Sequence, residues 1–139
     1  MMTAKEYLSQ LKRLEFMIDH ELIEYTTLME RAKADSSPAL KERVQTSQLM
    51  EPMDDVISAV DISKDIVARQ KEYLQKRREI VDQIHSMSNP LYANVLYKRY
   101  VLDYKFERIA TDINHTYRYT INIHGSALRA FQSQFLSGK

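Results

Sequence analysis

The sequence predicts an all-α fold, in which a long N-terminal helical hairpin, similar to a coiled coil, is followed by a C-terminal module of three helices. Only two glycines and three prolines occur among 139 residues, so sharp turns are few. Apolar residues recur three or four positions apart over most of the chain, as expected for helices with one buried face. The pattern is interrupted at Pro38, Pro52 and Pro90, which separate the expected helical segments.

The first helix is predicted to begin after Thr3 and to extend to about Ala34. Thr3 and Glu6 have the spacing of a capping box, in which the hydroxyl and the carboxylate each satisfy a free backbone N–H group. Apolar residues follow a heptad repeat, and Glu21 is the one polar residue at a heptad core position. This repeat consists of Ala4, Tyr7, Leu11, Leu14, Ile18, Tyr25, Leu28 and Ala32, widened by Leu8, Leu22 and Met29. The helix is therefore expected to pack against other helices.

A second long helix is predicted to begin at Met53 or Asp54, with Pro52 in a favourable early position. Residues 35–52 are expected to connect it to the first helix, because the sequence there has no clear helical period. The apolar residues of the second helix form two adjacent stripes. One consists of Val56, Val60, Val67, Leu74, Val81 and Ile84, and the other of Ala59, Ile66, Tyr73, Ile80 and Met87. Residues 1–88 should thus form two long amphipathic helices, which can pair within one chain or between the two chains of a homodimer.

The stretch Ser88-Asn89-Pro90 breaks the helical pattern and marks the expected start of a second domain, residues 89–139. A helix is predicted from Pro90 to about Val101. Its inward-facing residues should be Leu91, Val95, Leu96 and Tyr100. Asp103 is expected to act as the N-cap of the next helix, from about Tyr104 to Ile113.

The segment from Phe106 to Phe131 has the residue pattern of a helix-turn-helix. Ala110, between Ile109 and Ile113, places a small residue where two helices would cross closely. Asn114 follows where the turn needs a left-handed backbone, which Asn tolerates best among the non-glycine residues. An isoleucine-alanine core of this kind also occurs in helical domains that do not bind DNA, so the spacing alone leaves DNA binding open.

The helix after this turn is expected to have one packed face and one free face. Thr116 offers a hydroxyl as its N-cap, and the inward residues should be Thr120, Ile123, Ala127, Leu128 and Phe131. The second helix of a helix-turn-helix lies in the DNA major groove, where Arg can bind guanine, Asn can bind adenine and an aliphatic side chain can contact thymine methyl. The candidate DNA-binding residues are therefore Lys105, Thr116, Tyr117, Arg118, Ile121, Asn122, Gly125 and Arg129.

Gly125 is unusual because it lies in the interior of this predicted helix. Glycine costs about 1 kcal/mol relative to alanine at such a position. We interpret it as a site of close approach, either to a DNA phosphate or to the neighbouring helix, although chance substitution is the simpler alternative.

Charge is distributed unevenly along the chain, whose formal net charge is +1. From Asn89 onward, seven Lys and Arg residues accompany three acidic residues, so this part carries +4 and the first 88 residues carry −3. A basic C-terminal part is the arrangement expected if that part meets the phosphates of double-stranded DNA.

Several other functions are not supported by the sequence. Glycine-rich phosphate-binding loops are absent, and no acidic residue has an evident partner nucleophile or base, so we expect neither an enzyme nor a cofactor. The chain has no cysteine, and its four histidines lack the spacing of metal ligands, so we expect no metal site. No signal peptide and no run of 18 apolar residues is present, which favours a cytoplasmic protein without a membrane partner.

The segment VLYKRYVLDYKFERIATDINHTYRYTINIHGSALRAF resembles the region 4 helix-turn-helix of bacterial sigma factors. The shared residues are Leu96, Arg99-Tyr100, Glu107, Ile109-Ala110 and Ala127-Leu128. Over nearly its full length, the chain is similar to phage-encoded transcription regulators of the ArpU and RinA type, which activate late genes. That similarity is carried by the opening MTAKEYL, by Glu42 to Ser47, by Tyr117-Arg118-Tyr119, and by His124-Gly125. The family usually has glycine at the positions of Asp103 and Asn114, and a branched aliphatic residue at that of Thr120.

The resemblance implies a DNA-binding regulator of a phage or prophage transcription unit in a bacterial host cell, in contact with host RNA polymerase. The alternative is a structural or DNA-packaging protein, such as an oligomer similar to the small terminase subunits. In that class the DNA-binding module usually precedes the oligomerisation helices. The order here is reversed, which favours the transcription regulator.

Overall fold

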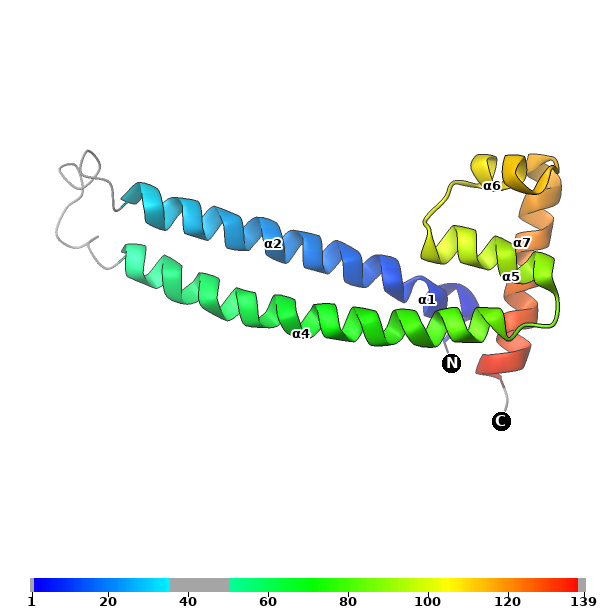
Figure 1. Ribbon diagram of the computed structural model, residues 1–139, viewed down its shortest axis with the longest axis horizontal. Coiled ribbons are helices and arrows are strands. Elements are labelled where there is room, and N and C mark those ends of the chain that lie inside the picture. Colours follow the sequence, from blue (N-terminus) through cyan, green and yellow to red (C-terminus); the bar gives the residue numbers. More distant parts are fainter. Residues whose placement is uncertain (1, 36–50, 138–139) are drawn as a thin grey trace. The chain divides into compact units, whose positions relative to one another are not determined.

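The computed structural model describes residues 2–35 and 51–137, and within these ranges every regular element is helical (Figure 1). The predicted all-α class is therefore confirmed. The elements, in order, are α1 (Ala4–Leu8), α2 (Gln10–Asp35), α4 (Glu51–His85), α5 (Pro90–Leu96), η2 (Tyr97–Val101), α6 (Phe106–Ile113), α7 (Tyr117–Phe131) and η3 (Gln132–Leu136). The segments η2 and η3 are π-helical turns that continue α5 and α7. No helix in the described ranges has the length and apolar character needed to cross a lipid bilayer.

Contacts group the chain into two compact units. The hairpin unit consists of Leu14–Glu72, and the C-terminal unit consists of Met1–Arg13 together with Tyr73–Lys139. This grouping differs from the expected division near residue 88, because the end of α4 contributes Ile80 to the same core as the C-terminal helices. Eight of the nine tyrosines belong to the C-terminal unit, and Tyr25 is the exception.

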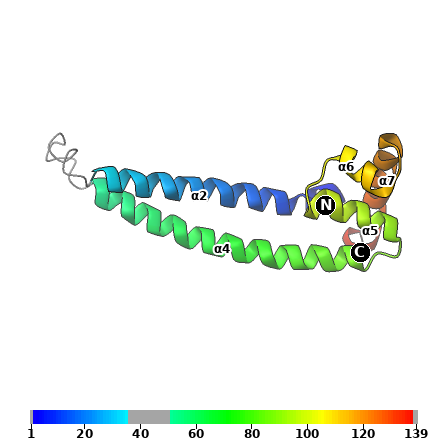
Figure 2. The same cartoon turned by 45° about the horizontal axis from the view of Figure 1, so that its top comes forward.

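In the hairpin unit, α2 and α4 lie side by side in both ribbon views (Figures 1 and 2). Its buried apolar residues are Leu14, Ile18, Leu28, Ala32, Ala59 and Ile66. Glu21, the polar exception in the heptad repeat, accepts a hydrogen bond at 2.9 Å from Nε of Arg69. Nε of Arg31 lies 3.5 Å from Oδ2 of the buried Asp55, so two ion pairs join the helices. The heptad prediction for α2 is therefore confirmed for Leu14, Ile18, Leu28 and Ala32, whereas Leu22 and Met29, which were expected to widen the packed stripe, are exposed.

The capping box at the N-terminus is confirmed. The backbone N–H of Glu6 donates to the Thr3 hydroxyl at 3.1 Å, and the backbone N–H of Thr3 donates to the Glu6 carboxylate at 2.8 Å. The backbone N–H of Thr3, and next its side-chain hydroxyl, hydrogen-bond to the carboxylate and hold the pKa of Glu6 below its ordinary value. The expected first helix is divided at Ser9, which separates α1 from α2.

The second long helix begins earlier than predicted. Its first residue is Glu51 rather than Met53 or Asp54, so Pro52 lies in the first turn, where its missing N–H leaves no helical bond unmade. Most of the expected connection, including the segment from Glu42 to Ser47, lies outside the described residues.

The two apolar stripes of α4 differ in burial. In the stripe that contains Ala59 and Ile66, both of these side chains are buried. In the other stripe, Val60 and Val67 are exposed. One face of α4 in the hairpin unit is thus packed, while an adjacent apolar face is open.

The C-terminal unit has a single core built from residues distant in the sequence. The buried members are Ala4, Leu8, Leu11, Ile80, Ile84, Met87, Leu96, Val101, Ala127 and Phe131. Phe131 is fully buried, and its ring centroid lies 5.8 Å from that of Tyr7. The first helix and the end of α4 therefore form part of the scaffold that positions α7.

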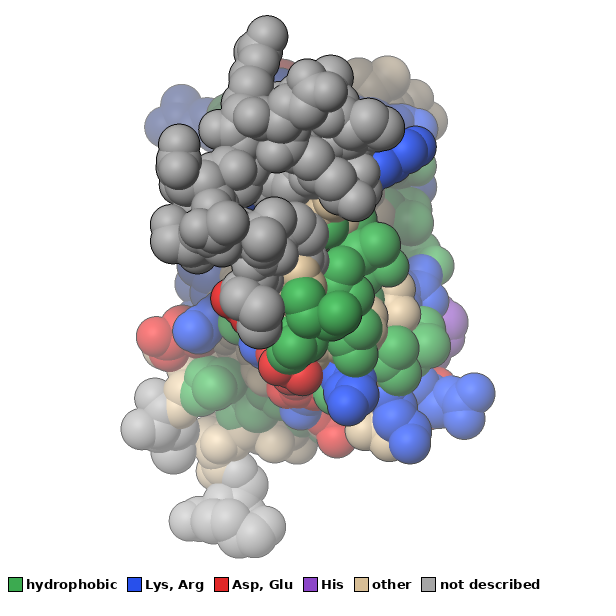
Figure 3. Space-filling view, turned by 90° about the vertical axis from the view of Figure 1, so that its left-hand side faces the viewer, with side chains coloured by type: hydrophobic (Ala, Val, Ile, Leu, Met, Phe, Trp, Pro, Cys, Tyr) green, Lys and Arg blue, Asp and Glu red, His purple; other side chains and the backbone are tan. Residues whose placement is uncertain are grey.

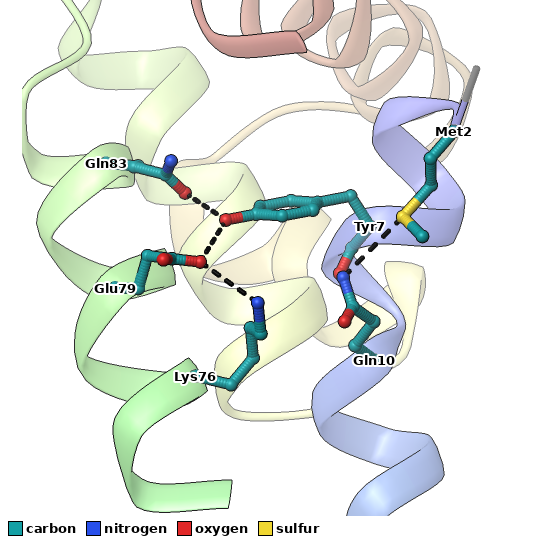
Figure 4. A network of polar contacts seen from close by, with 6 residues as sticks. All are labelled: Met2, Tyr7, Gln10, Lys76, Glu79 and Gln83. Carbon is teal, nitrogen blue, oxygen red and sulfur yellow. Dashed lines mark hydrogen bonds and ion pairs between the residues drawn. The ribbon is translucent and has the colours of Figure 1, made fainter. Parts of the chain in front are cut away.

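A polar network joins α1 to α4 beside this core (Figure 4). The Tyr7 hydroxyl lies 2.6 Å from Oε1 of Glu79 and 2.8 Å from Oε1 of Gln83. Lys76 donates to the same Glu79 oxygen at 3.1 Å. Burial, and next the Glu79 carboxylate, raise the pKa of Tyr7 well above its ordinary value, so its hydroxyl remains a donor at neutral pH.

Candidate nucleic-acid interface

The turn between α6 and α7 has the predicted left-handed residue. Asn114 ends α6 with φ of 59° and ψ of 44°, and the N–H of His115 donates to the Ala110 carbonyl at 3.0 Å. Asn is the non-glycine residue that adopts this region most readily. The turn then extends through Thr116 to the start of α7, so the chain changes direction within a few residues.

The beginning of α7 is capped as predicted. The Thr116 hydroxyl accepts a hydrogen bond at 3.0 Å from the backbone N–H of Tyr119, and the extended backbone of Thr116 is typical of an N-cap. A threonine hydroxyl can still donate its own hydrogen while it accepts this bond. The cap therefore leaves Thr116 able to donate to a phosphate.

The packed face of α7 also follows the prediction. Thr120, Ala127 and Phe131 are buried, whereas Ile123 and Leu128 are half-buried. The Thr120 hydroxyl donates to the Thr116 carbonyl at 2.8 Å, so this buried hydroxyl has a hydrogen-bond partner. In α6, Ile109 and Ala110 are buried, so the small side chain of Ala110 lies within the packed core.

The opposite face of α7 contains the predicted contact residues. Tyr117, Arg118, Asn122 and Arg129 are exposed, and Ile121 and Gly125 are half-buried. Within the described part of the chain, the side chains of Arg118 and Asn122 form no hydrogen bond or ion pair. The structure thus brings these residues together on one helical face, where they remain available to a ligand.

The close approach expected at Gly125 does not involve the neighbouring helix, so that part of the prediction is wrong. Among the described residues, the nearest atom to a Cβ built on Gly125 would be Nη1 of Arg129, at 3.6 Å. This is ordinary van der Waals contact with a flexible side chain of the same helix. Close approach of a phosphate stays a prediction for this glycine, with chance substitution as the alternative.

Asp103 does not cap the next helix, contrary to the prediction. It has φ of 59°, a left-handed conformation, whereas an N-cap residue needs extended backbone. Its carboxylate instead lies 3.0 Å from Nζ of Lys12. The next helix, α6, begins at Phe106, and Lys105 occupies the N-cap position without a side-chain cap bond. Lys105 is exposed, so its ammonium group is free to reach a phosphate.

Arg99 positions the segment before α6 rather than facing a ligand. Its guanidinium donates to the Tyr104 carbonyl at 3.1 Å and lies 4.2 Å from the centroid of the Phe106 ring. In the sequence, Arg99 stood out only as part of the Arg99-Tyr100 pair shared with sigma factor region 4. Arg99 comes five residues before Tyr104 and seven before Phe106, but no helical periodicity predicts that its guanidinium contacts them.

His124 is a further residue that the sequence prediction left without a role. Its Nε2 atom lies 2.7 Å from the Tyr100 hydroxyl, and its ring contacts Phe106 edge to face at 4.8 Å. Burial, followed by the nearby charges of Arg99 and Lys5, lowers the pKa of His124 to about 4. The ring is therefore neutral at pH 7, and its role is to pack the inner side of α7.

Cationic side chains surround the exposed face of α7 unequally. Lys98 lies 3.4 Å from Asp112, so its charge is largely balanced. Arg108 stacks over the Tyr104 ring at 3.7 Å and remains exposed. Together with Lys105, Arg118 and Arg129, it supplies positive charge suited to a polyanion. Within the described ranges, no three His, Asp or Glu side chains are grouped closely enough to hold a metal ion.

Comparisons with known proteins add no identification. No family model matches the chain, and no match was found among curated proteins or solved structures.

Proposed function

We propose that this protein is a sequence-specific DNA-binding transcription regulator that inserts α7 into the major groove. The observation that carries the proposal is the geometry at Asn114 and Thr116. A left-handed turn and an N-cap begin α7, and its outward face contains Arg118 and Asn122, whose side chains have no partner among the residues that the structure describes. Such a helix after a short turn is the recognition element of a helix-turn-helix.

The exposed residues suit different parts of a DNA duplex. Arg118 and Asn122 can read base edges, since guanidinium and amide groups each form bidentate bonds to a purine. Ile121 can contact a thymine methyl group. The cations Lys105 and Arg129 and the hydroxyls of Thr116 and Tyr117 suit phosphates. Gly125 leaves room for the DNA backbone to approach the helix.

The resemblance to phage-encoded regulators supports a narrower proposal. In this proposal, the protein activates late genes of a phage or prophage and contacts host RNA polymerase. It is supported by residues shared with that family in α7, namely Tyr117-Arg118-Tyr119 and His124-Gly125. The left-handed backbone at Asp103 and Asn114 adds to it, because glycine is usual there in the family.

Selection of bound duplexes from a random pool, at a stated moderate salt concentration, tests the function. An enriched sequence is expected, and affinities for it and for random DNA can then be compared. Replacement of Arg118 by Ala should reduce discrimination between the two by about 1 to 3 kcal/mol. The control is Arg78→Ala, which removes an exposed arginine of α4, far from α7 in the sequence, and should leave discrimination unchanged.

Two outcomes would count against the proposal. If no sequence were enriched, sequence-specific regulation would be rejected. If Arg118→Ala weakened the binding of specific and random DNA equally, Arg118 would contact phosphate rather than a base. A ring of many subunits in solution that binds DNA without sequence preference would instead support the DNA-packaging alternative.

A further inference from the structure

The hairpin unit has large apolar side chains that are not buried between α2 and α4. Val67 is 64% exposed, Met53 is 58% exposed and Leu22 is 43% exposed, although all are large apolar side chains. The exposed set in this unit is Phe16, Leu22, Ile23, Met29, Met53, Ile57, Val60 and Val67. Scattered exposed apolar residues are common, but a contiguous apolar patch usually marks an interaction site.

Five of these residues, Leu22, Met29, Met53, Val60 and Val67, lie on one face of the hairpin. Met29 of α2 and Met53 of α4 line the same open, apolar groove. Positions seven residues apart lie on one stripe of a packed helix, so Leu22 continues this face from Met29, and Val60 and Val67 continue it from Met53. Figure 3 views the end where α2 finishes and α4 begins, and shows hydrophobic side chains gathered beside acidic and basic groups.

We propose that this face, called here the hairpin face, binds the same face of a second copy of the chain. A side chain of this size exposes roughly 100 Å² of apolar surface when fully accessible, a value that follows from transfer free energies. Five side chains that are about half exposed therefore offer on the order of 250 Å². A standard interface buries about 800 Å² per partner, of which about 60% is apolar. The hairpin face therefore supplies about half of the apolar area of a standard interface, and polar groups at its border would supply the rest.

Charge and register favour a second copy over an unrelated partner. Glu21 and Arg69 are level with each other along the hairpin, because their side chains pair at 2.9 Å. Since α2 and α4 run in opposite directions, Asp19 is level with Lys71. Both are exposed, Asp19 three residues before Leu22 and Lys71 four residues after Val67, so they border the hairpin face on opposite sides.

A two-fold axis parallel to the helices both buries the hairpin face and brings Asp19 opposite Lys71. It lays α2 of one copy on α4 of the other while keeping each residue at its own level along the axis. Asp19 of each copy then faces Lys71 of the other, so the dimer gains two opposite-charge pairs around its apolar centre. An axis perpendicular to the helices would lay α2 on α2, and Asp19 would then not face Lys71.

The first test measures the mass of the full chain in solution, without DNA, by sedimentation equilibrium. The wild-type protein should be a dimer, and Val60→Glu with Val67→Glu should raise its dissociation constant by about 100-fold or more, because four carboxylates would enter an apolar interface. The matched control is Ala68→Glu with Gln75→Glu, which adds the same charges at the same spacing on another exposed stripe of α4. It should remain a dimer.

The second test exchanges charges and keeps the apolar residues intact. Lys71→Glu alone and Asp19→Lys alone should each weaken the dimer about tenfold, because like charges would then face each other twice per dimer. An equimolar mixture of these two variants should form a heterodimer with nearly wild-type affinity. This exchange remains informative even if the double glutamate variant loses helicity, which circular dichroism would detect.

A monomeric wild-type chain at high concentration would overturn the proposal and assign the hairpin face to a different partner. A double glutamate variant that stays dimeric would also overturn it. Failure of the mixture to recover affinity would reject the arrangement of α2 on α4. Because no DNA is present, these results are separate from the test of sequence recognition.

Discussion

The left-handed backbone of Asn114 forms the turn between α6 and α7. A non-glycine residue pays about 1 to 2 kcal/mol in the left-handed region, and Asn is the one that tolerates it best. Replacement of Asn114 by Ala should therefore lower the free energy of unfolding by about 1 kcal/mol, whereas Asn114→Gly should be close to neutral. Urea denaturation followed by circular dichroism measures both.

Asp103 provides an internal comparison, since it has the same φ of 59°. Asp103→Gly removes an exposed ion pair with Lys12, which contributes little to the free energy of unfolding. It also replaces a residue in the left-handed region by glycine, which adopts that region without steric cost. It should behave like Asn114→Gly. Equal stability of Asn114→Ala and Asn114→Gly would show that the turn does not depend on this conformation.

His124 makes the stability of the C-terminal unit dependent on pH. Its pKa in the folded chain is about 4, below the ordinary value of 6.5, because of burial and the charges of Arg99 and Lys5. Between these two values the unfolded chain binds more protons than the folded chain. The stabilisation is therefore complete above pH 6.5 and is lost as the pH falls toward 4. Urea midpoints measured across this range should fall at low pH.

The variant His124→Gln isolates this effect from the titration of Asp and Glu residues. Glutamine can accept the hydrogen bond from Tyr100 but does not titrate. The difference in stability between wild type and variant should change with pH between 6.5 and 4 and be constant above 6.5. A difference that stayed constant throughout would mean that His124 is not titrating as described.

At the scale of elements, the hydrogen bonds of Tyr7 tie α1 to the end of α4. Tyr7→Phe keeps the ring and its contact with Phe131 but removes the hydroxyl between Glu79 and Gln83. The free energy of unfolding should fall by about 0.5 to 1.5 kcal/mol, the usual net contribution of one hydrogen bond. Tyr119→Phe is the control, because Tyr119 is exposed and stacks on His115 at the surface. An equal loss in both variants would argue against a specific role for the Tyr7 network.

The helices could be predicted from their repeated apolar spacing. The break at Ser9 and the change to a π-helical turn at Tyr97 could not. The heptad in α2 and the packed residues of α7 follow from local periodicity, which depends on the chain alone. The break at Ser9 and the π-helical turn after Leu96 depend on how separate elements pack. Asp103 was assigned as a cap because its residue type suits one, yet the backbone it adopts serves the preceding turn.

For the candidate interface, the residues on each face of α7 could be predicted from the sequence, whereas contacts between different elements could not. The outward residues of α7, such as Arg118 and Asn122, follow from helical spacing once the inward face is known. The contact of Arg99 with Phe106 and that of His124 with Tyr100 could not be predicted, because each joins two different elements. Whether the outward residues bind DNA stays a prediction.

At the scale of the whole molecule, the uneven charge should govern the response of DNA binding to salt. Each phosphate neutralised lowers the slope of log affinity against log salt concentration by about 0.9. Replacement of Lys105 by Ala should make this slope shallower by about one and weaken the binding of all sequences alike. Fluorescence anisotropy over a salt series measures the slope. An unchanged slope would remove Lys105 from the phosphate contacts.

The grouping of the chain into two units shows why a proline is an incomplete guide to domain boundaries. Ser88-Asn89-Pro90 ends α4 as expected, but Ile84 and Met87, just before this break, are buried in the core of the C-terminal unit. The helix end and the limit of a packed core are set by different interactions. Local backbone geometry determines the first, and the positions of buried side chains determine the second.

The concentration of tyrosines in the C-terminal unit has a practical consequence. The chain has no tryptophan, so ultraviolet emission comes from tyrosine, and Tyr25 is the only emitter in the hairpin unit. Emission therefore reports mainly on the C-terminal unit, while helical ellipticity reports on both. Two curves that separate during heating would give each unit its own melting temperature without any attached label.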